Sequence, residues 1–212
     1  ATSLGILIED FVNACSPEQT VYAGAIPNHV LEMARKRGLH FVDIMTWEPV
    51  SMLNSIATAE GAICEAIRNS IVNLQGSNVL ILGFGRCGQI IAKKIASLDA
   101  NVSVCVRKED VLSLAFAYGY EGFLLDELEE HVGKYDFIFN TIPAMVLPKN
   151  LLMKINAETA IIDIASSPGG VDFNFANDHC YNAGLYLGLP GLMSPKSSAK
   201  IQMDAILKDC MK

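Results

Sequence analysis

The sequence predicts an α/β protein, with a doubly wound parallel Rossmann sheet of six strands preceded by a partial smaller α/β domain and a long connecting helix. Three observations lead to this fold class. Strand-like and helix-like segments alternate strictly after residue 77, several strand-like runs are apolar throughout, and the first run leads into a G-x-G-x-x-G motif. Strict alternation implies a parallel sheet. Strands that helices cover on both faces read as continuous apolar runs.

The first 50 residues predict the smaller domain, which we expect on the substrate side. Asn28 is a candidate N-cap for its second helix, and Gly38 is placed to end that helix. Two strands make a marginal sheet alone and need partners from missing sequence, from the other domain or from another subunit. We expect a homo-oligomer, a dimer, that protects their edges. Because the chain begins at Ala1, inside a helix-like pattern, we expect the front of this domain to be missing. The expected elements are a helix at residues 3–14, a strand at 20–23, a helix at 28–37 and a strand at 39–44.

One long helix over residues 49–74, interrupted around residues 58–61, suits a connector. We therefore expect domain limits of 1–50, 51–76 and 77–212. Six strands are the full complement of a two-halved Rossmann domain, and we expect them at residues 78–82, 101–106, 121–124, 135–140, 159–164 and 185–189. The helices of this domain are expected at residues 86–98, 108–118, 125–132, 149–155, 173–183 and 194–211.

The composition is that of a globular protein without affinity for nucleic acid or membranes. Of the 212 residues, 51% are hydrophobic and 18% are charged, and the net charge of −7 disfavours binding to nucleic acid or to an anionic membrane. No apolar run is long enough to span a bilayer, and no signal peptide is visible. The six cysteines form no C-x-x-C pair and fit no zinc-site spacing, so we expect buried, reduced thiols in a cytoplasmic protein and no metal site.

The glycine motif is the strongest functional signal. Gly83 permits the tight turn out of the strand, Gly85 lets the backbone approach a pyrophosphate, and Gly88 lets the next helix pack against the strand. The helix N-terminus then offers free N–H groups and the positive end of its dipole to the phosphates. A glycine-rich turn without a ligand is the alternative, but this motif lies between a predicted strand and a predicted helix. We expect cofactor contacts from the whole loop, Gly83, Phe84, Gly85, Arg86, Cys87 and Gly88.

The end of the second predicted strand bears on the choice of nicotinamide cofactor. NAD sites place an acidic residue there for the ribose hydroxyls, whereas this chain has Arg107 and Lys108. A forked guanidinium suits the 2′-phosphate of NADP, so the sequence favours NADP. NAD is the alternative, because Glu109 or Asp110 could bind the ribose if the alignment shifts by two residues. A solvated turn is the alternative for Arg107 and Lys108.

Three further loops should meet at the ligand-binding edge of the sheet, where the carboxyl ends of parallel strands lie together. They follow the last three predicted strands and are rich in Pro, Gly, Ser and Thr. Ordinary turns prefer the same residues, but the common edge favours a ligand. The cofactor candidates in these loops are Asn140, Thr141, Ile142, Pro143, Ala165, Ser166, Leu189 and Pro190.

The start of the last predicted helix adds one candidate. Ser194 is a possible N-cap, with Pro195 at the first helical position. Lys196 then lies in the first turn, where a cation opposes the helix dipole. A residue that breaks a local rule at a site rim is a candidate functional group. We therefore expect Lys196 to bind a substrate carboxylate, with a solvated lysine as the alternative.

Several pieces of the sequence together resemble one known family. They are T-A-E-G-A-I at residues 58–63, N-T-I-P-A at 140–144, D-I-A-S-S-P-G-G at 163–170, G-L-P-G at 188–191 and S-P-K at 194–196. In this order they resemble the A subunit of dipicolinate synthase, from about residue 51 to the C-terminus. Ala57 and Cys87 stand where that family's pattern has proline and threonine, and neither change touches a glycine of the motif.

The resemblance implies an NADP-dependent oxidoreductase in the mother-cell cytoplasm of sporulating bacteria. It would oxidise a dihydrodipicolinate-type intermediate of lysine biosynthesis to dipicolinate, a small dicarboxylate, and would work with the flavoprotein-like B subunit of dipicolinate synthase. The protein would orient the ring and provide a positive environment for two carboxylates. We expect Thr58 as donor, Glu60 as base and Lys196 as carboxylate partner at the interdomain cleft. For Thr58 and Glu60, a helix-capping signal is the alternative.

Two other functions stay open. A 2-hydroxyacid dehydrogenase would share the connecting helix and the glycine motif, but it needs a histidine oriented by a carboxylate and an arginine for the substrate. A non-catalytic NADP-sensing or regulatory protein is favoured slightly by the missing front of the first domain. The chain has four histidines, His29, His40, His131 and His179. None lies next to a carboxylate at a predicted strand end, which counts against the dehydrogenase, although His40 could face the cleft.

Overall fold

The structure, a computed structural model, describes residue 5 and residues 7–211. Its internal contacts divide the chain into two compact units, Ala1–Asn54 with Lys196–Lys212 and Ser55–Pro195. The last helix, which we expected in the dinucleotide-binding domain, is grouped with the first unit. The domain limits of 1–50, 51–76 and 77–212 stay a prediction.

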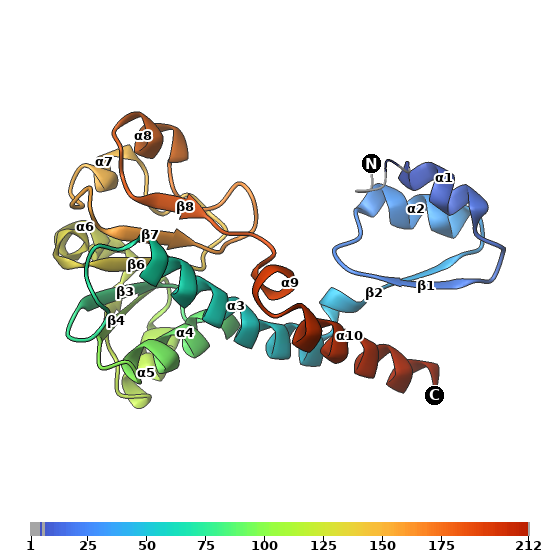
Figure 1. Ribbon diagram of the computed structural model, residues 1–212, viewed down its shortest axis with the longest axis horizontal. Coiled ribbons are helices and arrows are strands. Elements are labelled where there is room, and N and C mark those ends of the chain that lie inside the picture. Colours follow the sequence, from blue (N-terminus) through green and yellow to red (C-terminus); the bar gives the residue numbers. More distant parts are fainter. Residues whose placement is uncertain (1–4, 6, 212) are drawn as a thin grey trace. The chain divides into compact units, whose positions relative to one another are not determined.

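The second unit contains a parallel sheet with the strand order β5-β4-β3-β6-β7-β8 (Figure 1). This is the order of a Rossmann fold, which reverses between β3 and β6. For the described residues, the prediction of a doubly wound parallel sheet of six strands is confirmed. The strands are β3 (Asn78–Leu82), β4 (Asn101–Val106), β5 (Glu121–Leu124), β6 (Phe137–Asn140), β7 (Ala160–Asp163) and β8 (Ala183–Leu185).

Side chains of the sheet alternate between two hydrophobic layers. Val79 and Ile81 of β3 pack into the layer under one set of helices, and Leu80 and Leu82 pack into the layer on the opposite face. This coverage on both faces explains why β3 reads as a continuous apolar run. The first layer includes residues of α3 (Glu48–Asn69), α4 (Arg86–Ala96), α5 (Glu109–Ala117) and α9 (Leu189–Met193), and the second includes residues of α6 (Leu128–His131), α7 (Lys149–Leu152) and α8 (Phe173–Asp178).

Helix α3 runs without interruption through residues 58–61, so the expected break there is wrong. Small residues in this segment serve packing. Ala59 and Ala62 are fully buried, and a Cβ on Gly61 would lie 3.0 Å from the Cβ of Leu189. The glycine therefore lets α9 approach the helix closely, at the cost in helix propensity that an interior glycine carries.

The end of the sheet also differs from the expectation. The sixth strand was expected at residues 185–189, but β8 ends at Leu185. Gly188 adopts a left-handed conformation with φ +69° and precedes α9, a short helix that the sequence did not predict. Most side chains at residues 185–189 are apolar, and leucines flank the glycine. The sequence therefore reads as a strand, and the turn at Gly188 is not apparent from it.

The first unit contains a two-stranded parallel sheet, β1 (Thr20–Ala23) and β2 (His40–Asp43), in which Thr20 lies opposite His40. The strands connect through α2 (Asn28–Lys36). Val12 of α1 (Ile8–Ala14), Val30 of α2 and Leu39 belong to one buried core cluster. The remaining elements that bear on the site are η1 (Ile44–Thr46), a 3₁₀ turn, and the last helix, α10 (Pro195–Cys210).

The predicted limits of these elements are partly right. Gly38 has φ +69° just after α2, as expected for a residue that ends a helix. Asn28 is not the N-cap, because Pro27 occupies that position and no side chain caps the helix. Pro195 opens α10 as expected. Of the first expected helix, residues 3, 4 and 6 lie outside the described residues.

The structure bears on two expectations from composition, the burial of the cysteines and the lack of a membrane-spanning helix. The six cysteines are free thiols, and Cys15 and Cys105 are buried as expected, but Cys64, Cys180 and Cys210 are exposed. Burial raises the pKa of the Cys105 thiol to about 12, and the Glu127 and Asp126 carboxylates add to this. Among residue 5 and residues 7–211, no helix combines the length and the apolarity that a bilayer crossing requires.

Candidate functional site

The glycine motif forms the turn between β3 and α4. Gly83 has φ +93°, a conformation that side chains disfavour, and its N–H donates to the Cys105 carbonyl at 2.8 Å. A Cβ on Gly88 would collide with the carbonyl oxygen of Gly83, so the absence of a side chain lets α4 pack against the end of the strand. A Cβ on Gly85 would meet nothing within 4 Å. The turn therefore has two glycines required by packing and one that faces open space.

The N-terminus of α4 lies at the carboxyl end of β3, where a ligand could reach it. Gly85 is the N-cap, and no side chain caps the helix. The first N–H groups of this 11-residue helix, together with its dipole, form the kind of site that binds phosphate. Arg86 is exposed next to it, and Cys87 is half-buried. Burial raises the pKa of the Cys87 thiol, whereas the Arg86 guanidinium acts in the opposite direction.

Phe84 does not present its ring to the ligand edge. The side chain is 4% exposed and belongs to the core layer under α4. Its ring packs edge-on against the rings of Tyr118 and Tyr120, with centroid distances of 6.2 and 5.8 Å. Any contribution of Phe84 to a cofactor would therefore come from its backbone.

Arg107 and Lys108 lie directly after β4, between the strand and α5. Both are exposed, and in the part of the chain that the structure describes neither side chain has an ion-pair or hydrogen-bond partner. Glu109 and Asp110 form the first turn of α5, where acidic side chains complement the helix dipole. The cations are thus placed at the end of the second strand of the Rossmann sheet, and the carboxylates already have a local structural role.

The loops after β6 and β7 are joined by a buried polar network. Asn140 and Asp163 end these strands, and both side chains are fully buried. Asn140 Nδ2 donates to Asp163 Oδ1 at 3.0 Å, and the backbone N–H groups of Ala165 and Gly170 donate to Asp163 at 2.9 and 2.6 Å. Burial raises the pKa of the Asp163 carboxyl, and these three hydrogen bonds act in the opposite direction.

Sequence reasoning did not select Asp163 as a site residue. The signal was present, because an acidic residue inside the apolar run Ile161–Ile164 at a strand end is unusual for a buried strand. Asn140, which was selected as a cofactor ligand, has its amide occupied within the protein, since Nδ2 also donates to the Ile142 carbonyl and Oδ1 accepts from the Ile142 N–H. Its contribution to a cofactor would be indirect.

Thr141 connects the loop after β6 to the glycine turn. Its hydroxyl and its N–H both donate to the Leu82 carbonyl at 2.9 Å, and its side chain lies where a Cβ on Gly83 would be. The remaining candidates differ in exposure. Pro143 and Ser166 are exposed and Ile142 and Pro190 are half-buried, whereas Ala165 and Leu189 are buried.

The three catalytic candidates lie in different surroundings. Thr58 is half-buried in α3. The Glu60 carboxylate is exposed and pairs with Lys94 Nζ at 2.8 Å. Lys94 lies in the last turn of α4, roughly 12 Å along the helix from its N-terminus at a rise of about 1.5 Å per residue. Lys196 is exposed in the first turn of α10 and belongs to the first unit.

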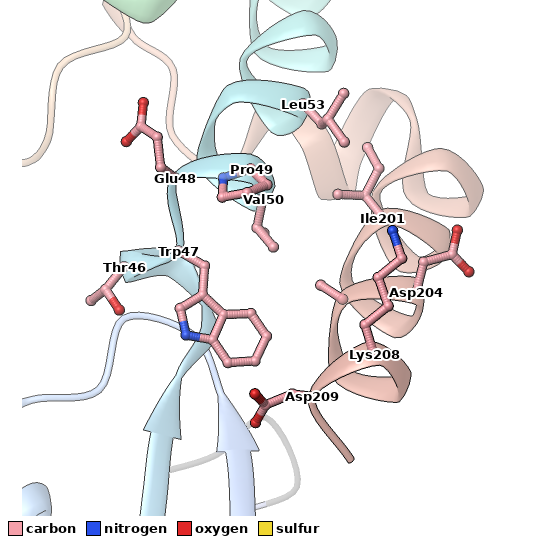
Figure 2. Close-up of a pocket in the computed structure, with 11 residues that line it drawn as sticks. Thr46, Trp47, Glu48, Pro49, Val50, Leu53, Ile201, Asp204, Lys208 and Asp209 are labelled. Atoms are coloured by element: carbon pink, nitrogen blue, oxygen red, sulfur yellow. The ribbon is translucent and has the colours of Figure 1, made fainter. Parts of the chain in front are cut away.

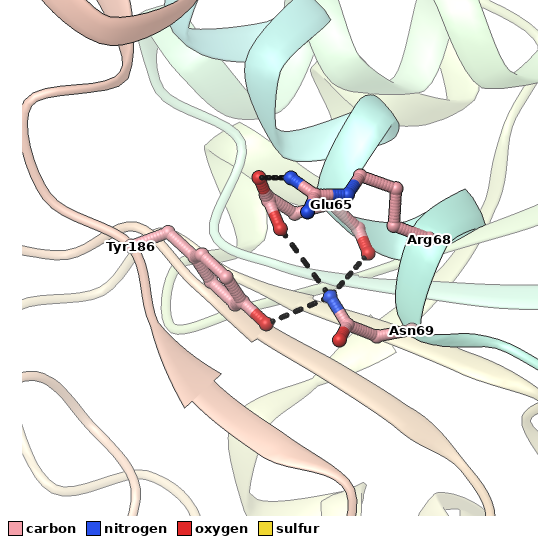
Figure 3. A network of polar contacts seen from close by, with 4 residues as sticks. All are labelled: Glu65, Arg68, Asn69 and Tyr186. Atoms are coloured by element: carbon pink, nitrogen blue, oxygen red, sulfur yellow. Dashed lines mark hydrogen bonds and ion pairs between the residues drawn. The ribbon is translucent and has the colours of Figure 1, made fainter.

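Figure 3 shows a polar network at the end of α3. Asn69 Nδ2 donates to the Tyr186 hydroxyl at 3.1 Å and to the Glu65 carbonyl at 2.8 Å, and Arg68 pairs with Glu65 at 3.1 Å. Burial, followed by the Glu65 carboxylate, raises the pKa of Tyr186 above its usual value, whereas the Arg68 guanidinium and the Asn69 hydrogen bond act in the opposite direction. The network connects α3 to the segment after β8. The helix ends at Asn69, whereas the sequence predicted an end at Leu74.

The first unit has a cavity of about 660 Å³ beside Trp47 (Figure 2). Trp47 and Asp209 lie at one end, and Leu53 and Ile201 lie at the other. Its volume is in the range of small-molecule sites. None of the site residues predicted from the sequence lines it.

The comparisons with known proteins agree with this geometry. Residues 52–163 match the family model of the NAD binding domain of D-isomer specific 2-hydroxyacid dehydrogenases. Shikimate dehydrogenase (NADP(+)) from Pyrococcus abyssi (strain GE5 / Orsay) is 27% identical over 134 residues, which cover 56% of this chain and 49% of that protein.

The A subunits of two dipicolinate synthases are more similar to this chain than the shikimate dehydrogenase is. The one from Bacillus subtilis (strain 168) is 34% identical over 203 residues, which cover 96% of this chain and 68% of that protein. Its crystal structure matches with a TM-score of 0.89 and 33% identity over 97% of this chain and 69% of that chain. The crystal structure of the one from Bacillus halodurans matches with a TM-score of 0.89 and 34% identity over 96% of this chain and 69% of that chain. The chain therefore belongs to the family of dipicolinate synthase A subunits, with an NAD(P)-binding domain of the 2-hydroxyacid dehydrogenase type.

Proposed function

We propose that this chain oxidises a dihydrodipicolinate-type intermediate to dipicolinate with NADP⁺ as the hydride acceptor. In this reaction a ring carbon transfers hydride to the nicotinamide and the ring loses one proton to a base, so that the products are dipicolinate, NADPH and a proton. The observation that carries the proposal is the 34% identity to the dipicolinate synthase of Bacillus subtilis over 96% of this chain. The open N-terminus of α4 and the cations after β4 support the cofactor.

Direct turnover tests the reaction. The purified chain is given NADP⁺ and freshly generated dihydrodipicolinate, and both NADPH and dipicolinate are measured. We expect equal amounts of the two products. If the chain binds NADP but forms no dipicolinate, alone or with its B subunit, the proposal is wrong and a cofactor-sensing role replaces it.

The preference for NADP rests on Arg107. An exposed guanidinium without a partner among the described residues is available for a 2′-phosphate. We expect isothermal titration to give NADP binding at least about tenfold tighter than NAD binding. Arg107→Asp should remove this difference by weakening NADP and leaving NAD unchanged. Lys93→Asp, the same charge reversal at an exposed position in the last turn of α4, should keep the preference. Equal or tighter NAD binding by the native chain would contradict it.

For the chemical step we propose Thr58 as donor, Glu60 as base and Lys196 as carboxylate partner. Glu60 can be tested sharply, because its ion pair provides a matched control. Glu60→Gln and Lys94→Gln both break the same exposed pair, which should alter the free energy of unfolding by less than about 1 kcal/mol. If Glu60 is the base, kcat falls in Glu60→Gln and is kept in Lys94→Gln. An equal, small effect of both variants would assign Glu60 a structural role.

A 2-hydroxyacid dehydrogenase activity is less well supported. That chemistry needs a histidine oriented by a carboxylate. In the second unit, the His131 ring packs against Phe123 with a centroid distance of 4.6 Å, and the His179 ring stacks on Phe175 at 4.0 Å. These contacts favour a packing role for both histidines.

The assembly and location belong to the same proposal. We expect the partner to be a flavoprotein-like B subunit, and we expect a homo-oligomer of this chain in the cytoplasm of a sporulating cell. Light scattering of the purified chain tests the homo-oligomer, and a monomer would contradict it. Co-purification with a tagged B subunit tests the partner.

A further inference from the structure

We infer that Asp163 is a positioning residue for the nicotinamide half of the cofactor, because its carboxylate holds the loops after β6 and β7 together as one surface. This inference rests on the proposed binding of NADP at the carboxyl edge of the sheet. We call the set Asn140, Asp163, Ala165 and Gly170 the Asp163 clasp.

Both oxygens of the carboxylate are used within the protein. Oδ1 accepts from the Asn140 amide and the Ala165 N–H, and Oδ2 accepts from the Gly170 N–H. The side chain is fully buried. A buried carboxylate is unfavourable unless hydrogen bonds compensate for lost water. The groups that do so here are the amide of Asn140 at the end of β6 and two backbone N–H groups of the loop after β7, so the end of β6 and this loop must keep their conformation for the charge to be tolerated.

Glycines make the close approach of the two loops possible. A Cβ on Gly169 would lie 2.7 Å from Asp163 Oδ2, and a Cβ on Gly170 would lie 2.5 Å from both Asn140 Nδ2 and the Ala144 carbonyl. The Gly170 carbonyl in turn accepts from the N–H groups of Val146 and Leu147, both at 2.8 Å. Each loop therefore fixes the other through contacts that leave no room for a side chain.

The location of the clasp connects it to the cofactor. Strands β6 and β7 belong to the second half of the sheet, which starts where the strand order reverses next to β3. In a Rossmann fold each half binds one mononucleotide of the cofactor, so the adenosine half would lie over β3 and β4 and the nicotinamide half over β6 and β7. Pro143 and Ser166 are exposed residues of the clasped loops and are available to a ligand there.

Asp163 would thus act through the loops and not by touching the cofactor. In Asp163→Asn, an amide NH₂ group replaces one accepting oxygen, and at least one of the three donors then has no acceptor. The loops can relieve this by moving apart. The nicotinamide half of NADP should lose its contacts, whereas the adenosine half, held by the glycine turn and Arg107, should keep them.

The experiment compares two ligands on the full chain by isothermal titration. NADP⁺ spans both halves of the sheet, and adenosine 2′,5′-bisphosphate occupies the adenosine half. Asp163→Asn should weaken NADP⁺ by about tenfold or more and change the bisphosphate by less than about twofold. The control Asp136→Asn removes the same charge at the opposite, amino edge, where Asp136 accepts from the Asn78 N–H at 2.8 Å, and should change neither ligand.

A second variant reaches the clasp without changing charge. Gly170→Ala places a Cβ against Asn140 and the Ala144 carbonyl and should produce the same selective loss of NADP⁺. Equal losses of both ligands, or no loss of either, in both variants would overturn the inference. The native chain tests the proposed function separately: if it binds neither ligand, the NADP site itself is wrong and the inference falls with it.

Discussion

The two halves of the Rossmann edge use their polar groups in opposite ways. On the side of β3 and β4, the N-terminus of α4 has no side-chain cap, and Arg107 has no partner among the described residues. On the side of β6 and β7, Asn140 and Asp163 are fully buried and hydrogen-bonded to each other and to the backbone. The first half keeps groups available for a ligand, and the second uses them to fix its own shape. Binding and positioning are therefore expected to separate when each half is changed alone.

The largest effect should come from Gly88→Ala. Its Cβ would collide with the Gly83 carbonyl oxygen, which is backbone and cannot rotate away. Overpacking of this kind destabilises by about 1–3 kcal/mol, and the shift of α4 should also abolish NADP binding. Urea denaturation and titration measure the two effects. A native-like free energy of unfolding would contradict the packing argument.

A smaller and more selective effect is expected for Gly85→Ala. Its Cβ would meet no protein atom within 4 Å, and its φ of −79° suits alanine. The free energy of unfolding should be unchanged or slightly higher, by up to about 1 kcal/mol. If a pyrophosphate approaches this backbone, the added methyl group should weaken NADP about tenfold or more. Full NADP affinity in this variant would show that the phosphates lie elsewhere.

The smallest expected effect is a pH dependence from Asp163. Burial raises the pKa of this carboxyl above 3.8 in the folded chain. As the pH rises from 3.8, the unfolded chain loses this proton first, so the native state binds more protons and the contribution of Asp163 to stability falls until the pH passes the raised pKa. Asp163→Asn lacks this contribution. The difference in unfolding free energy between the native chain and Asp163→Asn should therefore change between pH 3.8 and the raised pKa, and it should be constant at higher pH. Urea titrations at several acidic pH values measure it, and a constant difference throughout would contradict the prediction.

The fold was largely predictable because its signals are local. The run Val79–Leu82, the three glycines and the alternation that follows are each readable from a few neighbouring residues. The elements that were wrong depend on distant contacts. Gly61 looked like a break because its packing against Leu189 cannot be read from α3, and Asn69, where α3 ends, contacts Tyr186, 117 positions away.

The site was predictable where the backbone makes it and less so where side chains do. The glycine turn follows from a motif that specifies backbone geometry. Phe84 was included with that motif, yet its ring belongs to the core. Asn140 was selected for its place at a strand end, and its partner Asp163, 23 positions away, was not. Pairing across that separation requires knowledge of which strands are neighbours.

The contrast between Arg107 and Asp163 bears on how this family could change. Because the Arg107 side chain has no partner in the described part of the chain, it can be replaced by a single mutation, so a lineage could exchange one coenzyme for the other at residue 107 with little disturbance elsewhere. Asn140, Asp163, Gly169 and Gly170 offer no such freedom, because each single replacement leaves a hydrogen-bond donor or acceptor without its partner or inserts a side chain where none fits. Coenzyme choice is thus expected to vary among descendants of this fold, while these four positions should drift slowly or change together.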